Sequence, residues 1–163
     1  MKINTKSLMF TAGLFLGSYG VYRTVDKIIC NNKTTRRLYH YYRTANQWLC
    51  NKDRNINIAD FFAEQGIKSI AVYGMGELGK RFVAELKNSA VEIKYVIDKH
   101  PDLLYDNIKI ISLEQLQEKG AEPVDMVIVT PIHDFEKIEK AISGCGDFDI
   151  VSLEDVIFYF AWD

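Results

Sequence analysis

From residue 67 onward, short apolar runs alternate with stretches in which apolar residues recur at helical steps. The apolar runs predict five strands, at residues 69–73, 92–97, 108–111, 125–130 and 149–151. The stretches between them predict helices at residues 77–86, 113–119 and 134–143, with a last one after residue 152. This alternation predicts an α/β fold of three layers, with a five-stranded parallel sheet between two layers of helices. Right-handed crossovers favour the strand order 3-2-1-4-5.

Polar residues next to these segments predict how several helices begin and end. Ser112 followed by Gln115 is the spacing of a capping box, Gly120 is expected to end that helix, and Ser152 is expected to cap the last one. Upstream, residues 58–65 form a short helical pattern that Gly66 should end. The polar run at residues 51–57 is typical of a connecting loop.

Residues 34–50 form an amphipathic pattern with one apolar, aromatic face: Leu38, Tyr41, Tyr42, Ala45, Trp48 and Leu49. The opposite face carries Arg36, Arg37, Arg43 and Gln47. A basic amphipathic helix suits an anionic membrane surface, and aromatic residues among arginines suit single-stranded nucleic acid. We favour a third interpretation, in which the aromatic face packs on the following domain, and nucleic acid is not favoured. The chain is thus divided into a helical N-terminal extension, 1–66, and a domain at 67–163.

Residues 7–22 form a run without any charged side chain. A membrane span needs about 20 apolar residues, and this run is shorter and interrupted by Gly13, Gly17 and Gly20. It is interpreted either as a marginal span or interfacial anchor, or as a helix docked on the domain. If it is inserted, the basic residues after it hold the domain on the cytoplasmic side. The expected location is therefore cytoplasmic, with the inner face of the membrane as an alternative site of attachment.

Composition narrows the class of protein without naming a reaction. The 163 residues are 48% hydrophobic and 26% charged, which excludes disordered, collagenous and wholly membrane-embedded chains. Three cysteines without a CxxC pair fit neither a disulfide framework nor a zinc site, so no metal is expected. Residues 1–66 carry ten Lys and Arg against four acids, whereas residues 67–163 carry ten against eighteen. The domain is therefore acidic and the extension basic.

The most specific motif is the GxGxxG of Gly74, Gly76 and Gly79, which follows the first strand and opens a helix. In such a loop the first glycine permits a tight turn, the second lets a pyrophosphate approach, and the third lets the helix pack closely on the strand. The helix N-terminus then favours an anion. The expected ligand contacts include the intervening residues Met75, Glu77 and Leu78.

Asp98 ends the second strand, nineteen residues after Gly79. At that position a carboxylate binds ribose hydroxyls, which favours a ribose without a 2′-phosphate. The alternative is that the three glycines serve only the turn and the packing, and that Glu77 competes with a phosphate for the same N–H groups. The ligand proposed from this pattern is NAD or a nucleotide-sugar.

Thr130, Pro131 and His133 follow the fourth strand, which the predicted order places beside the first. Thr130 and Pro131 are thus further candidates for ligand contact. His133 has an intrinsic pKa suited to acid–base chemistry, and Asp134 or Asp98 is a candidate for tuning it. We favour an exposed loop histidine, because no nucleophile, metal ligand or second catalytic group accompanies it. Cys145 lies between two glycines and is interpreted as a turn residue.

The segments IAVYGMGELGKRFVAEL, VEIKYVIDKH, DMVIVTP and DIVSLEDVIF resemble the small Rossmann-like domains of bacterial capsule and surface-polysaccharide biosynthesis proteins. More distantly, the chain is similar to the nucleotide-sugar-binding domains of sialic-acid-type acetyltransferases and of sugar epimerases and dehydratases. The resemblance covers roughly residues 45–159, and by residue Gly74, Gly76, Gly79 and Asp98 match the binding pattern. The chain lacks the YxxxK pair of short-chain dehydrogenases and the left-handed helix repeat of the acyltransferases, so neither catalytic role is carried over.

Three hypotheses about function follow. The favoured one is an accessory domain without independent catalysis, which binds a nucleotide or nucleotide-sugar and serves surface-polysaccharide assembly beside a biosynthetic enzyme. The second is a small NAD-dependent oxidoreductase or sugar-nucleotide epimerase that completes its active site with a partner subunit. The third is a non-binding scaffold for membrane or protein contacts. A homodimer is a further expectation, because the edge strands of the sheet are free to pair.

Overall fold

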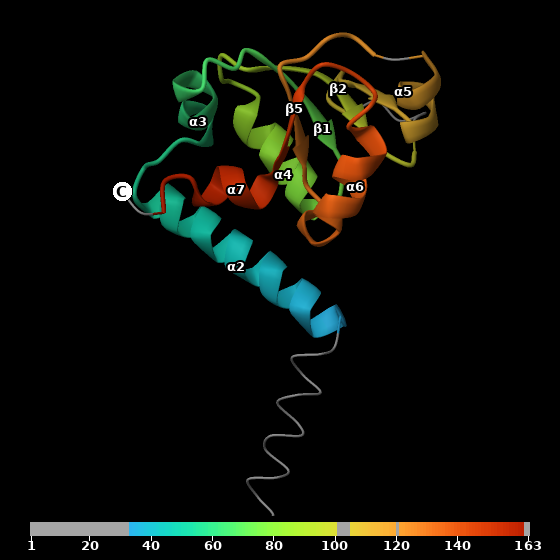
Figure 1. The fold of residues 1–163 in the computed structure, drawn as a ribbon. Helices are drawn as coiled ribbons and strands as arrows, with labels where there is room; N and C mark the ends of the chain where they lie inside the picture. Colours follow the sequence, from blue (N-terminus) through green and yellow to red (C-terminus); the bar gives the residue numbers. More distant parts are fainter. Residues whose placement is uncertain (1–32, 101–104, 120, 162–163) are drawn as a thin grey trace, which may run out of the picture. The chain divides into compact units, whose positions relative to one another are not determined.

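The structure is a computed structural model that describes residues 33–100, 105–119 and 121–161. Its centre is an all-parallel sheet of five strands in the order β3-β2-β1-β4-β5 (Figure 1). The strands are β1 Ser69–Tyr73, β2 Glu92–Ile97, β3 Lys109–Ile111, β4 Met126–Val129 and β5 Asp149–Ser152. The predicted α/β class and strand order are therefore confirmed. Gly120, the expected end of one helix, lies outside the described residues.

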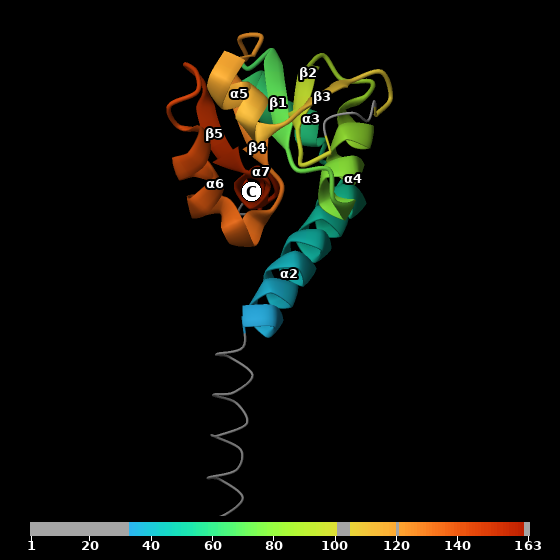
Figure 2. The same ribbon diagram turned by 90° about the vertical axis from the view of Figure 1, so that its right-hand side faces the viewer.

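Helices lie on both sides of this sheet (Figures 1 and 2). On one side are α3 Ile58–Glu64, α4 Glu77–Leu86 and α7 Leu153–Phe158, and on the other are α5 Leu113–Lys119 and α6 Phe135–Ile142. A short 3-10 turn, η1 Ile132–Asp134, precedes α6, so the helix predicted from residue 134 begins one residue later. The three predicted layers are present.

Each face of the sheet has its own apolar core, because the strands are buried on both sides and their side chains alternate between them. Ile70, Val72 and Val96 point to the face that α4 and α7 cover, and Ala71 and Val127 point to the other face. Helix α4 supplies Phe82, Val83 and Leu86 to the first core. Among the described residues, this first core contains more buried side chains than the second. Some of them lie upstream of the sheet in the sequence.

Those upstream residues change the expected domain boundary. The chain divides into two compact units, residues 1–40 and 41–163. Within the second unit, Trp48, Ile58, Phe61 and Phe62 belong to the same core as the strands of the sheet. The helices between residues 41 and 64 are therefore part of the folded unit that contains the sheet, although the sequence pattern assigned them to an extension.

Helix α2, Lys33–Asp53, is longer than the predicted helix at 34–50 and takes up the start of the predicted loop at 51–57. The reason is Asn51, whose side chain is 1% exposed. Its Nδ2 donates to the carbonyl of Ile157 at 2.8 Å, and its Oδ1 accepts from Gln47 Nε2 at 2.9 Å. A polar residue thus continues the helix because the folded unit provides its hydrogen-bond partners.

The aromatic face of α2 packs on the domain only in part. Within the second unit, Trp48 is buried, and its Nε1 donates to Glu85 Oε2 at 2.7 Å. Tyr42 and Leu49 are instead 67% and 65% exposed. The interpretation that the whole apolar face forms core contacts is therefore wrong for these two residues, because they lie on a different side of the helix from Trp48.

Helix caps follow the sequence signals closely. Ser112 N donates to Gln115 Oε1 at 2.9 Å and Gln115 N donates to Ser112 Oγ at 3.1 Å, which is the reciprocal pair of a capping box. Ser152 Oγ accepts from Glu154 N at 3.2 Å at the start of α7. Gly66 follows α3 with a φ of 71°, the left-handed conformation expected after a helix end.

Among the described residues, no helix has the length and apolar character needed to cross a membrane. Residues 7–22, the segment interpreted as a marginal span or anchor, lie outside the described residues.

Asp125 joins the starts of β1 and β4, and its charge makes the fold sensitive to acid. Its Oδ2 accepts from the backbone N–H groups of Lys68 and Ser69 and from the Ser69 hydroxyl, at 2.9, 2.8 and 3.0 Å. These hydrogen bonds lower the pKa of Asp125. The stabilisation is fully present above the unfolded-state pKa of about 3.9 and is lost as pH falls through the lower folded-state value.

Replacing Asp125 with alanine is therefore expected to lower the urea midpoint of unfolding at pH 7. The difference between wild type and Asp125→Ala should shrink as the pH falls through the lowered folded-state pKa of this carboxyl, because the wild-type side chain then becomes protonated. Urea unfolding of both proteins at pH 7 and at an acidic pH below that pKa measures this. An equal difference at both would show that the carboxylate charge does not stabilise the strand junction.

Candidate functional site

The loop between β1 and α4 is shaped by a glycine in a left-handed conformation. Gly74 has a φ of 92°, and its N–H donates to the carbonyl of Ile97 at 2.8 Å, which ties the loop to the end of β2. A Cβ on Gly74 would lie 2.9 Å from Pro131 Cδ and 3.0 Å from Thr130 Oγ1. Both the backbone angle and the neighbouring loop therefore require glycine here.

Gly79 has a packing role. It is buried in the first turns of α4, and a Cβ there would lie 2.1 Å from the carbonyl oxygen of Gly74. The helix thus crosses the loop with backbone against backbone. This is the close helix-to-strand contact expected of the third glycine of the motif.

Gly76 is different, because a Cβ at this position would have no atom within 4 Å. It is the N-cap residue of α4, and no side chain caps that end of the helix. The N–H groups of the first turn lack intrahelical partners and carry the positive end of the helix dipole. Neither the turn nor the packing requires a glycine at position 76. This position instead combines open space with unpaired backbone N–H groups.

Asp98, just after β2, is fixed against this loop. Met75 N donates to Asp98 Oδ2 at 2.7 Å, and His100 N approaches Asp98 Oδ1 at 3.3 Å. A carboxylate has about four lone-pair sites, so two backbone contacts leave acceptor capacity for ligand hydroxyl groups. The structure thus places Asp98 beside the glycine loop, as its spacing predicts, and shows that the loop orients its carboxylate.

Tyr73 interacts electrostatically with two carboxylates, those of Asp98 and Glu114. Burial raises the pKa of the Tyr73 hydroxyl, and the carboxylates of Asp98 and Glu114 raise it further. Hydrogen bonds from its own backbone N–H and from Ser112 lower the pKa of Glu114, which favours its ionised form. The carboxyl edge of the sheet therefore carries a phenol, that of Tyr73, which stays protonated and interacts electrostatically with two carboxylates.

The sequence analysis did not identify Tyr73 or Glu114 as site residues. The available signal is positional, since Tyr73 ends the first strand and Glu114 stands in the first turn of the helix after the third. Parallel pairing aligns Tyr73 with Ile97, the residue before Asp98. Residues at the ends of adjacent parallel strands lie at the same edge of a sheet, where ligands bind in such folds.

Thr130 and Pro131 hold the loop from the β4 side. The Thr130 hydroxyl lies 2.7 Å from the carbonyl oxygen of Gly74 and 3.1 Å from that of Tyr73. Thr130 is 3% exposed, so its hydroxyl forms hydrogen bonds within the protein. Both residues adjoin the glycine loop as predicted, and their contacts support its conformation. Direct contact between either residue and a ligand stays a prediction.

His133 lies in η1, with its side chain 17% exposed. Its Nε2 is 3.0 Å from Asp134 Oδ2, and its ring centroid is 5.5 Å from that of Tyr41 on α2. Its Nδ1 is buried and has no hydrogen-bond partner in the described part of the chain. The interpretation of an exposed loop histidine therefore does not describe this side chain. Its contacts are with Tyr41 and Asp134, and a catalytic role stays a prediction.

No metal site is evident among the described residues. They contain no group of three His, Cys, Asp or Glu side chains arranged to hold an ion. Cys145 N donates to the carbonyl of Ile142 at 2.9 Å in the turn after α6, and its Sγ lies 3.8 Å from the carbonyl of Ala141. These contacts agree with a turn residue.

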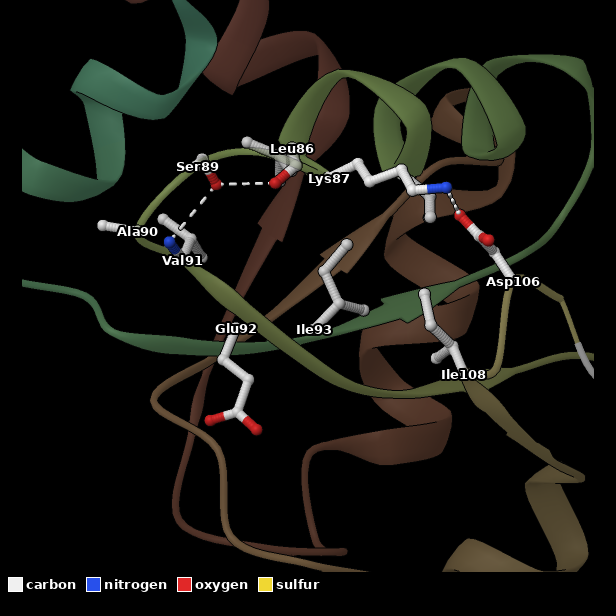
Figure 3. Close-up of a pocket in the computed structure, with 10 residues that line it drawn as sticks. Leu86, Lys87, Ser89, Ala90, Val91, Glu92, Ile93, Asp106 and Ile108 are labelled. Atoms are coloured by element: carbon white, nitrogen blue, oxygen red, sulfur yellow. Dashed lines mark hydrogen bonds and ion pairs between the residues drawn. The ribbon is translucent and has the colours of Figure 1, made fainter.

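A cavity of about 380 Å³ lies at the opposite end of α4 from Gly76 (Figure 3). The C-terminal half of α4, the segment into β2 and the approach to β3 line it, and the Lys87–Asp106 ion pair of 2.6 Å crosses its rim. Its other lining side chains are mainly apolar, and Glu92 points away from it towards Lys94, 2.8 Å away. The carboxyl edge of the sheet remains the candidate site, because the glycine loop and Asp98 lie there and ligands of open parallel sheets bind at that edge.

Comparison of the chain with protein-family models, with curated proteins and with solved structures finds no match. The functional interpretation therefore depends on the geometry of the loop and of the carboxylates beside it.

Proposed function

We propose that this protein binds a nucleotide, NAD or a nucleotide-sugar, at the carboxyl edge of β1 and β2. The ribose hydroxyls donate to Asp98, and the phosphate groups lie against the backbone of Gly76 and the first turn of α4. The observation that carries the proposal is the Asp98 carboxylate, held by Met75 N at 2.7 Å beside a glycine whose side-chain position is open. Both features support binding of a nucleotide at this edge.

The surrounding charges favour a particular kind of nucleotide. Asp98, Glu77 and Glu114 all lie on the elements that form this edge, so a phosphate on the ribose 2′-hydroxyl would meet like charge. The pyrophosphate of a dinucleotide or nucleotide-sugar can instead lie at Gly76. There the positive end of the helix dipole offsets the repulsion by these carboxylates. NAD and nucleotide-sugars are therefore favoured over NADP.

We further propose an accessory role without independent catalysis. Within the described residues, His133 contacts Asp134 and the Tyr41 ring, and the feature that this edge offers a ligand is the Asp98 carboxylate, an acceptor for hydroxyl groups. A role in bacterial surface-polysaccharide assembly, beside a biosynthetic enzyme, is supported by the resemblance of the sequence segments. The binding experiment below is independent of that role.

The Asp98→Asn variant is expected to bind NAD or UDP-glucose about tenfold more weakly than wild type. The amide oxygen still accepts from Met75 N, so the loop keeps its shape, but the ribose hydroxyl exchanges a charged acceptor, worth about 1.5–3 kcal/mol, for a neutral one worth about 0.5–1.5 kcal/mol. The same change removes a repulsion of the 2′-phosphate, so the preference for NAD over NADP should narrow. Isothermal titration of both proteins with NAD, NADP and UDP-glucose measures these affinities.

Asp106→Asn is the matched control, since Asp106 pairs with Lys87 at the cavity of Figure 3 and should leave the affinities unchanged. Gly76→Asp places a carboxylate in the open space and should abolish binding of all three ligands. Absence of binding by the wild-type protein to every ligand of the set would contradict the proposal. Equal affinities of wild type and Asp98→Asn would contradict the role of this carboxylate.

A further inference from the structure

The cavity at the opposite end of α4 from Gly76 has the size of a small-molecule site (Figure 3). Its volume of about 380 Å³ lies within the usual range of about 300–1,000 Å³ for such sites. Val83 and Leu86 of α4 are 2% and 1% exposed, and both line it. The proposed nucleotide site at the carboxyl edge of the sheet uses neither side chain. The cavity is therefore a separate feature of the molecule.

The rest of the apolar lining comes from β2 and from the turn before β3. Figure 3 shows Ile93 and Ile108 pointing into the space beside the Lys87–Asp106 pair. Both isoleucines are partly buried and pack against the same core as Val83. Aliphatic side chains from three segments of the chain thus converge on the cavity, and they offer a ligand apolar surface to cover.

A tight turn forms the rim of the cavity. Asp106 and Asn107 have φ angles of 53° and 68°, and Tyr105 and Ile108 exchange backbone hydrogen bonds of 3.4 and 2.9 Å. Left-handed angles at both central residues define a two-residue hairpin turn, and Asp and Asn adopt them more readily than most residues. The turn places the Asp106 carboxylate 2.6 Å from Lys87 Nζ. A specific backbone conformation therefore builds this rim.

The charged side chains that line the cavity already have partners within the protein. Lys87 and Asp106 pair with each other, and Glu92 points away from the cavity, with its Oε2 2.8 Å from Lys94 Nζ. A charged ligand would have to break one of these ion pairs or enter the cavity without a partner of its own. Either course costs free energy, because the charge loses its hydration. The existing ion pairs therefore favour a neutral ligand.

The polar groups at the end of α4 are used in the same way. The Ser89 hydroxyl donates to the carbonyl of Leu86 at 2.8 Å and accepts from Val91 N at 3.2 Å. The carbonyl of Leu86 also accepts from Ser89 N at 2.9 Å. The surface that these contacts leave for a ligand is that of the aliphatic side chains. Apolar cavities of this kind bind small neutral hydrocarbons.

We propose that this cavity is a second binding site, which takes a small, neutral and mainly apolar molecule such as one with an aromatic ring system. Such a ligand buries its apolar surface against Val83, Leu86, Ile93 and Ile108. The Lys87–Asp106 pair stays intact at the rim. The site is independent of the proposed nucleotide site, since no residue contributes to both.

Three probes with the same naphthalene ring test the proposal: naphthalenemethanol, which is neutral, naphthoate, an anion, and naphthylmethylammonium, a cation. The neutral probe is expected to bind, and each charged probe should bind at least about tenfold more weakly, because its charge is desolvated without a partner. Titrations of the full chain followed by NMR of isoleucine methyl groups measure the affinities. The signals of Ile93 and Ile108 should shift, whereas that of Ile150, on the other face of the sheet, should not.

Ile108→Ala removes part of the lining and should weaken binding of the neutral probe about tenfold. Ile150→Ala is the matched control, because it shortens another partly buried isoleucine, on the opposite face, and should leave the affinity unchanged. Urea unfolding of both variants checks that each is folded at the titration conditions.

Three results would overturn the proposal. The first is a wild-type protein that does not bind the neutral probe. The second is binding of either charged probe as tightly as the neutral one, because the ion pairs at the rim would then not select the ligand. The third is a set of methyl shifts that leaves out Ile93 and Ile108, since the probe would then bind at a different surface.

Discussion

Phe62→Ala is expected to lower the free energy of unfolding by about 3–5 kcal/mol, the range for removal of a buried aromatic side chain. The Phe62 side chain is 0% exposed, and its ring centroid lies 5.1 Å from that of Phe61 and 6.2 Å from that of Phe82 on α4. Loss of the ring would leave a cavity between α3, α4 and the sheet. Urea unfolding followed by circular dichroism measures the change.

Glu64→Ala, an exposed change on the same short helix, should alter stability by no more than about 0.5 kcal/mol. If Phe62→Ala had an equally small effect, α3 would contribute little to the core of the domain. The predicted boundary at residue 66 implies that outcome. The expected large effect instead means that a fragment of residues 67–163 lacks part of its own core.

Gly79→Ala is expected to destabilise the protein by about 2 kcal/mol, within the range for overpacked interiors. Helix propensity alone would predict a gain of about 1 kcal/mol for alanine in the interior of a helix. The clash decides the sign, because the new Cβ would lie 2.1 Å from the carbonyl oxygen of Gly74 and 3.2 Å from Thr130 Oγ1. The Gly74 backbone and the buried Thr130 side chain both lie against this position, so α4 cannot shift to relieve the clash.

Gly144→Ala tests this interpretation, since a Cβ at Gly144 meets no atom within 4 Å. Its urea midpoint should stay close to that of wild type, while that of Gly79→Ala falls. If Gly79→Ala were more stable than wild type, α4 and the glycine loop would separate readily. The close packing of helix on loop that shapes the candidate site would then be contradicted.

Sequence patterns predicted the centre of the fold well because local and tertiary signals agree there. The bounds of β1, α4 and β2 match the predicted ranges, since glycines mark the ends of β1 and the apolar residues of α4 recur on one face. Thr130 and Asp98 adjoin the glycine loop because the strand order places the ends of β2, β1 and β4 side by side. The motif and the topology together were therefore sufficient for this part of the candidate site.

Other features depend on contacts between distant residues, which periodicity does not contain. Asn51 looks like a loop residue, yet the carbonyl of Ile157, 106 positions away, keeps it in a helix. Tyr42 and Trp48 share one apolar pattern, and only the packing of α2 shows that one is exposed and the other buried. The pairing of Asp98 with Met75 N also depends on the folded loop, because neither residue type implies the other.

Glu85 joins helix α2 to helix α4. Its carboxylate accepts from Trp48 Nε1 at 2.7 Å and lies 2.6 Å from Lys52 Nζ, so the α2 helix is joined to α4, whose other end is Gly76. A nucleotide that moved α4 on binding would therefore have either to carry α2 along with it or to break these two contacts.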